Sequence, residues 1–194
     1  MAPSLRGMLV IAAVAAVTIP LTAVGAVATP SQTAPGARAG VYEAHWLRSM
    51  VQADIFEIAA ARLALARSQN PTLRQAAESL VADHTTALQQ KRALARSLRV
   101  LLPERTAAVQ TMLLNQLNRT TDVAEFDQLF ARVQIAAHQE AILMSAEAAR
   151  AGIDGRLRTY AKTTVPVLKQ HLQSFRALAQ ELGLPEGGKA PSTT

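Results

Sequence analysis

Four long stretches of helical periodicity, separated by two very short breaks and one long one, constrain the fold most. Apolar residues recur every three or four positions across residues 42–67, 71–99, 122–151 and 154–182,. The good helix formers alanine, leucine, arginine and glutamine dominate, and aromatic residues make up only 4% of the chain,. The sequence therefore predicts an all-α protein whose helices pack through small side chains.

Local signals mark where these helices begin and end. Asn70 is a good N-cap, with Pro71 at the first helical position,. Asp122, with Glu125 three residues later, is typical of a capping box,. Gly152 is expected to end the third long helix as a left-handed cap. The first two helices and the last two are thus joined by very short turns, which makes each pair antiparallel.

A longer connection separates the two pairs. Residues 100–121 form a segment of about 22 residues with its own apolar pattern, which predicts a short helix there,. Such a segment is long enough to travel along the bundle. We therefore expect a ferritin-like antiparallel four-helix bundle, two hairpins joined by a long crossover. Pro166 lies inside the last helix and should kink it.

We predict that the bundle comprises residues 41–182 and that the two ends of the chain are not part of it. Residues 1–28 combine a positive start with a long apolar stretch and a small-x-small cleavage signal, which is typical of a secretory signal peptide,. An uncleaved N-terminal membrane anchor is the alternative, and this segment would then be the only membrane contact. Residues 29–40 and 183–194 have linker and tail compositions. The expected location is exported: periplasmic, cell-envelope or secreted.

Charge and cysteine content narrow the function classes. The formal charge is +6, but the basic residues are spread over all helices without a dense run, which argues against a nucleic-acid partner,. A partner in the envelope fits the mildly cationic surface better. The chain has no cysteine, which excludes disulfides and thiolate ligands,. Neither the partner nor the oligomeric state follows from these properties.

One ionisable residue lies near the middle of each long helix, flanked at helical spacing by apolar residues. These four are Glu57, His84, His138 and His171. Each lies roughly 20–25 Å from its hairpin turn at 1.5 Å per residue, so they should form one buried layer. Burying such groups is costly unless they satisfy one another or share a ligand.

Two readings of this layer stay open. Buried histidines are more often part of a closed hydrogen-bonded network, here with Glu57 orienting the imidazoles. Alternatively, three nitrogens and one carboxylate could bind one transition-metal ion. This set of ligands suits zinc, copper or iron better than magnesium or calcium. His45 should be exposed and incidental. Asp83 should pair with an arginine on the flank of its helix, with orientation of a neighbouring ligand as the alternative.

Several motifs together resemble the exported bacterial domain of unknown function 4142 family, a ferritin-like group, over about Trp46–Leu182. The motifs are EIAAARLALA at 57–66, LVADHT at 80–85, LP at 102–103, EFD at 125–127, VQIAAHQEAI at 133–142 and VPVLKQHL at 165–172. The resemblance implies a ferritin-like bundle and an envelope or secreted location. It implies no reaction.

Di-iron chemistry is disfavoured by the residues themselves. Ferritin-like di-iron proteins need Glu-x-x-His on two helices, but Val81, Ile135 and Leu168 precede the three histidines at that spacing,. No catalytic residue is predicted, and an enzyme is the least favoured class. The predicted function is that of an exported ferritin-like helical-bundle protein of unknown biochemical activity, with the buried Glu/His layer as a candidate site for a single transition-metal ion. The alternative is a structural or interaction module of the envelope whose polar core holds no metal.

Overall fold

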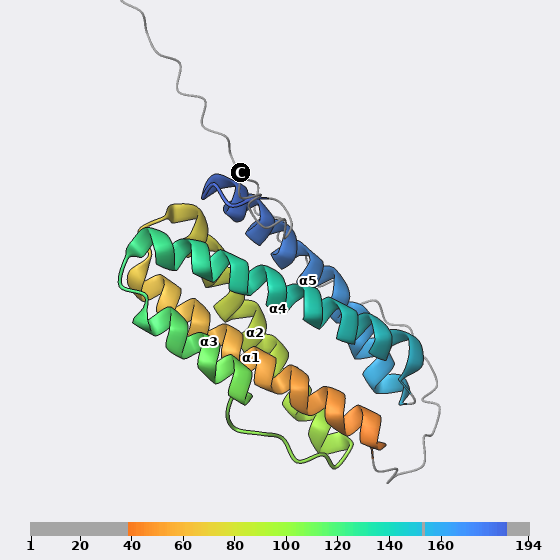
Figure 1. The fold of residues 1–194 in the computed structure, drawn as a ribbon. Helices are drawn as coiled ribbons and strands as arrows, with labels where there is room; N and C mark the ends of the chain where they lie inside the picture. The colour runs from red at the N-terminus through yellow and green to blue at the C-terminus, as the bar shows by residue number, and fades with distance from the viewer. Residues whose placement is uncertain (1–38, 153, 186–194) are drawn as a thin grey trace, which may run out of the picture. The chain divides into compact units, whose positions relative to one another are not determined.

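The chain folds into helices only, within the part that the structure describes. The structure, a computed structural model, describes residues 39–152 and 154–185. Its helices (Figure 1) are α1 Val41–Arg67, α2 Pro71–Ser97, α3 Ala108–Arg119, α4 Val123–Ala151 and α5 Gly155–Glu181. The predicted all-α class and the predicted short helix in the crossover are confirmed.

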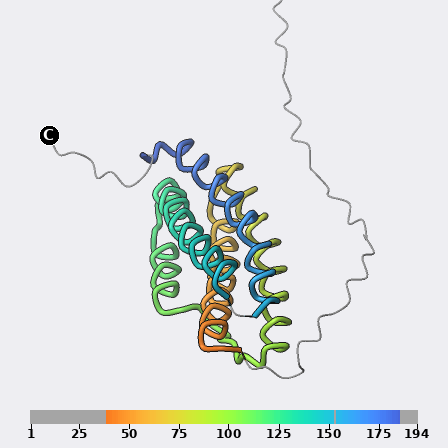
Figure 2. The backbone as a smooth tube through the Cα atoms, turned by 90° about the vertical axis from the view of Figure 1, so that its right-hand side faces the viewer, coloured from red at the N-terminus to blue at the C-terminus, as the bar shows by residue number. Residues whose placement is uncertain are grey.

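Two antiparallel hairpins make the bundle. The α1–α2 hairpin packs on the α4–α5 hairpin through contacts of α1 with α4 and of α2 with α5, and α3 lies against α1 and α4. Figure 2 shows the same arrangement from the side. The two hairpin turns lie at opposite ends of the bundle (Figure 1), so the middle of every long helix falls in the same region. α5 runs unbroken through Pro166.

Side-chain caps fix three of the helix starts. The Asn70 side chain accepts a hydrogen bond from the Leu73 amide (2.9 Å), and Asp122 accepts one from the Glu125 amide (2.7 Å), as predicted. Asp154 caps α5 in the same way. Each cap satisfies a backbone donor that the first helical turn leaves without a partner.

The predicted left-handed cap at Gly152 is wrong. Its φ is −56°, an ordinary value for any residue. A Cβ at this position would lie 2.6 Å from the carbonyl oxygen of Ala148 and 3.1 Å from Leu157. Glycine is needed here because the chain turns tightly against itself. The left-handed glycine is Gly183, with φ +72°, at the end of α5.

Arginines of α1 hold both parts of the crossover. Arg48 donates to the Leu101 carbonyl (3.1 Å) before α3, and Arg67 donates to the Leu117 carbonyl (2.9 Å) at the end of α3. These bonds satisfy carbonyl groups that have no partner in a regular helix. They keep α3 against α1, along one side of the bundle core.

The apolar core consists of two clusters with a polar layer between them. One cluster surrounds Phe56, Phe126, Phe130 and Phe175 near the α1–α2 turn. The other surrounds Trp46, at the opposite end of α1. Along α2, α4 and α5, the predicted histidine lies between the stretches that supply the two clusters, and on α1 Glu57 directly follows Phe56 of the Phe-rich cluster.

The predicted signal segment and most of the predicted linker and tail lie outside the described residues. Leu184, which the sequence places in the tail, packs against the Phe-rich cluster. No helix in residues 39–152 or 154–185 has a stretch apolar and long enough to cross a bilayer.

Candidate metal site

Each long helix contributes one of the four predicted residues to the polar layer. Glu57 lies on α1, His84 on α2, His138 on α4 and His171 on α5, and their exposed fractions are 3%, 7%, 1% and 6%. All four line one cavity inside the bundle. The four residues are therefore buried around one cavity.

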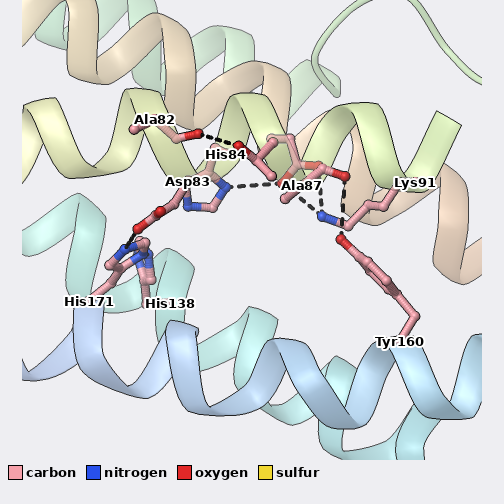
Figure 3. Close-up of polar contacts among 10 residues, drawn as sticks. Ala82, Asp83, His84, Ala87, Lys91, His138, Tyr160 and His171 are labelled. Atoms are coloured by element: carbon pink, nitrogen blue, oxygen red, sulfur yellow. Dashed lines mark hydrogen bonds and ion pairs between the residues drawn. The ribbon is translucent and has the colours of Figure 1, made fainter. Parts of the chain in front are cut away.

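His84 is held by a buried ion pair. Its Nδ1 lies 3.0 Å from Oδ1 of Asp54, and Lys91 donates to both oxygens of the same carboxylate at 2.9 and 2.7 Å. Because a carboxylate only accepts, the hydrogen of the neutral His84 ring is on Nδ1. Figure 3 shows this chain running from His84 toward Lys91 and Tyr160.

The other two rings are fixed in a similar way. His138 Nδ1 lies 2.9 Å from the carbonyl oxygen of Gln134, one turn earlier on α4. His171 Nε2 lies 2.9 Å from Oδ2 of Asp83 on α2 (Figure 3). Both partners are acceptors, so both ring nitrogens carry hydrogen. Metal-binding histidines characteristically donate from the non-ligating nitrogen to such oxygens.

These bonds decide which ring nitrogens are left as lone pairs in the neutral rings. They are Nε2 of His84, Nε2 of His138 and Nδ1 of His171. The His138 and His171 nitrogens lie 3.3 Å apart. His84 Nε2 has no hydrogen-bond partner among the described residues. The rings therefore direct acceptors, not donors, toward one another.

The distances between the three ring nitrogens are compatible with binding of all three to one metal ion. One nitrogen from each ring lies within 4.8 Å of one nitrogen from each of the other two. Two nitrogens bound to a tetrahedral ion at about 2.0–2.1 Å are about 3.3–3.4 Å apart. The His138–His171 pair already has this separation, and any pair near the 4.8 Å limit would have to close by about 1.4 Å to reach it,.

Burial favours the neutral form of two of these rings, His138 and His171. Burial, together with the neighbouring His84 and His171 rings, lowers the pKa of His138 to about 3. Burial also lowers the pKa of His171, although Asp83 opposes this. Neutral imidazole is the form that binds a metal ion.

Glu57 lies beside this histidine group but is not one of its members. The groups that could hold an ion within the described residues include the three histidines and not Glu57. Burial raises the pKa of the Glu57 carboxyl to about 7, with the His84 ring and the Gln134 side chain partly opposing the rise. Its Oε2 is buried and has no hydrogen-bond partner among the described residues. Its predicted role as a ligand stays a prediction.

A family model described as "Domain of unknown function (DUF4142)" matches residues 27–178. The chain belongs to this family. The resemblance predicted from the sequence motifs is thereby confirmed. No curated protein matches the chain.

Solved structures with a similar fold include a DUF305 fragment and CopM. A DUF305 fragment from Deinococcus radiodurans matches with a TM-score of 0.64 at 20% identity, covering 75% of this chain and 98% of its own. CopM in the Cu(I)-bound form has a TM-score of 0.61 at 15% identity, and in the Cu(II)-bound form 0.62 at 16%. Both CopM matches cover 72% of this chain and 96% of CopM. At these identities the likeness is one of fold.

Asp54 and Lys91 of this DUF4142 chain were not predicted to belong to the site. Their side chains are each only 1% exposed. Asp54 lies three residues before Glu57 and Lys91 lies seven after His84, so both occupy the face of a residue that was singled out,. That helical spacing was the feature of the sequence from which their place in the site could have been predicted.

Two individual predictions have opposite outcomes. His45 is exposed, as predicted. Asp83 does not pair with an arginine; its carboxylate orients His171, which was the alternative. The flank of α2 that carries Asp83 faces α5, so the side chain reaches the buried ring while remaining 51% exposed.

Proposed function

We propose that this chain binds one transition-metal ion through His84 Nε2, His138 Nε2 and His171 Nδ1. The observation that carries the proposal is the set of converging lone pairs. Three rings, each with one nitrogen hydrogen-bonded to an oxygen, bring ligand nitrogens within 4.8 Å of one another in a buried layer. A cation bound between these nitrogens would pair with their lone pairs, whereas no donor among the described residues reaches His84 Nε2.

The donor set favours a copper, zinc or iron ion. Imidazole nitrogens suit these metals, and the lack of paired carboxylates argues against a two-iron centre. CopM has been solved with Cu(I) and with Cu(II) bound. Its fold likeness makes copper the first metal to test. Glu57 is the candidate for a fourth ligand.

We place this activity in an exported protein that stores or buffers the ion without catalysing a reaction. The proposal rests on the signal-like composition of residues 1–28 and on the absence of a predicted catalytic set in the sequence,. A membrane contact is proposed only through that segment, and an envelope component is the proposed partner.

A metal-free polar core is the competing function, and it makes a different demand on His138 and His171. Without an ion, the 3.3 Å contact between His138 Nε2 and His171 Nδ1 is a hydrogen bond only if one of the two rings is doubly protonated,. Burial lowers the pKa of both rings and so works against that state. The layer would then serve only to set helix register.

Metal titration of the full chain tests the proposal. We expect one Cu(II) or Zn(II) ion per chain, and at least a hundredfold weaker binding in His84→Ala, His138→Ala and His171→Ala, each checked for helical content. His45→Ala is the matched control, because it removes the one exposed histidine among the four in the chain. A folded protein that takes up no metal, yet loses stability on histidine replacement, would support the competing function.

A further inference from the structure

A cavity of about 600 Å³ lies beside the three histidines. Native interiors are packed about as densely as organic crystals, so few voids exceed the size of a water molecule. Pockets for small organic ligands typically have volumes of about 300–1,000 Å³. The cavity is therefore far larger than a single metal ion bound to the three rings would need.

Small side chains create this space. Ala53, Ala137 and Ala141 line the cavity, and each lies within four residues of a residue of the polar layer. The neighbouring apolar cluster is instead filled by phenylalanines. The alanines thus leave open, beside the histidines, a volume that larger side chains would fill.

The cavity has an apolar body, a polar end and a route to solvent. Met50, Leu113 and Leu168 contribute apolar walls. Its lining also includes Val109 and Arg132, both exposed residues, so the space reaches the surface beside the start of α3. A molecule can therefore enter from the side of the bundle.

Two buried polar atoms of residues that line the cavity have no partner within the described part of the chain. They are His84 Nε2 and Glu57 Oε2. If Glu57 accepts a hydrogen bond instead of binding the ion, three protein nitrogens leave at least one position of a four-coordinate ion for an external ligand. A ligand head that both donates an electron pair to the ion and offers an N–H to Glu57 would satisfy the ion and the carboxylate together.

We infer that the cavity binds a small molecule with an apolar body and a neutral imidazole-type head, which completes the coordination of the ion. This inference rests on the proposed metal binding. An imidazole provides both required groups, one lone pair and one N–H. A neutral head is favoured because a charged one would lose its hydration in an apolar cavity.

Two probes of the copper(II)-loaded full chain test this inference. Imidazole presents the head alone, and 4-phenylimidazole presents the same head with an apolar body. Binding is followed through the visible absorption and electron paramagnetic resonance of the copper. We expect 4-phenylimidazole to bind at least tenfold more tightly than imidazole.

Cavity-filling variants provide the matched comparison. Ala53→Leu on α1 and Ala141→Leu on α4 each fill part of the space from a different helix. Both should keep the copper stoichiometry and reduce the preference for 4-phenylimidazole to less than threefold. Ala146→Leu, at an exposed position of α4 outside the lining, should keep the full preference.

The outcomes separate the two proposals. A chain that takes up neither copper nor zinc contradicts the proposed function itself, and one that takes up zinc but no copper overturns the ligand inference as stated and leaves metal binding intact. A chain that binds one copper but gives equal affinities for the two probes, or keeps its preference in both filled variants, overturns the ligand inference and leaves metal binding intact.

Discussion

The orientation of the three imidazoles depends on groups that contact the rings but are not themselves proposed to bind the ion. Asp54, Asp83 and the Gln134 carbonyl each hold one ring nitrogen, and so determine which nitrogen faces the centre. Partners of this kind raise ligand basicity and restrict ring rotation. At this scale, metal affinity should respond to the carboxylates as well as to the histidines.

Asp83→Asn removes the charge from the partner of His171. We expect about a tenfold loss of metal affinity, near the low end of the usual effect because Asp83 is half exposed,. The affinity is measured by competition with a chelator of known strength. Glu78→Gln, an exposed change on the same helix, is the control. An unchanged affinity in Asp83→Asn would show that the carboxylate does not support the site.

Lys91→Met leaves the Asp54 carboxylate buried without its cation. Removing one partner of a buried pair costs about 3–5 kcal/mol, so the free energy of unfolding in urea should fall by that order. The double variant Asp54→Leu with Lys91→Met should recover most of the loss, because it buries no isolated charge. A loss below about 1 kcal/mol in the single variant would contradict the buried ion pair.

At the scale of single helices, the residues at the helix ends hold the two helices of a hairpin in register. Asp154 starts α5 by accepting hydrogen bonds from the Arg156 and Leu157 amides. Gly152 ends α4 where the chain passes close to the Ala148 carbonyl. Both residues lie in the turn that positions His138 relative to His171.

The contribution of Asp154 should depend on pH. Its pKa is lowered, first by the hydrogen bond from the Arg156 side chain, so the folded state favours the carboxylate. The stabilisation is therefore complete above the unfolded pKa of about 4 and is lost as the pH falls through the lower folded pKa. Asp154→Ala should cost about 1 kcal/mol at pH 7 and less at pH 2.5. Thermal unfolding at both pH values tests this, and an equal cost at both would contradict it.

Gly152→Ala should destabilise the protein by about 1–3 kcal/mol, because the new methyl group would overlap the Ala148 carbonyl and force a backbone shift,. Gly155→Ala, three residues later, is the control. Its Cβ would meet no atom closer than 3.7 Å, and alanine favours a helix,. Denaturant unfolding of the two variants should therefore give changes of opposite sign. A harmless Gly152→Ala would mean that the turn is not close-packed.

For the whole molecule, the polar layer connects the two hairpins. His84 bonds to Asp54 within the first hairpin, His138 contacts His171 within the second, and Asp83 bridges from α2 to α5. An ion bound to the three rings would add a link between α2, α4 and α5. Metal binding should therefore stabilise the bundle as a unit.

Helices and their order were predictable because apolar periodicity and cap residues act locally. Asn70 and Asp122 satisfy backbone groups three residues away, so sequence neighbours reveal them. Gly152 was misread because both a left-handed cap and a close approach select glycine. Only the packing between α4 and α5 distinguishes them.

The candidate site was predictable only in part, because its partners come from different helices. Central position and apolar flanks identify Glu57 and the histidines. The pairing of Asp54 with Lys91, and of Asp83 with His171, depends on how neighbouring helices are rotated. Spacing within one helix does not fix that rotation, which is why these roles emerged only from the structure.

X-ray absorption at the copper edge of the loaded full chain tests the central claim most directly. We predict three histidine imidazoles around one copper, with nitrogen at about 2.0 Å and the outer-shell scattering that imidazole rings produce. The same spectrum from His138→Ala should show one imidazole fewer or no ordered copper. An environment of oxygen ligands without imidazole scattering in the unaltered chain would contradict the three-histidine site.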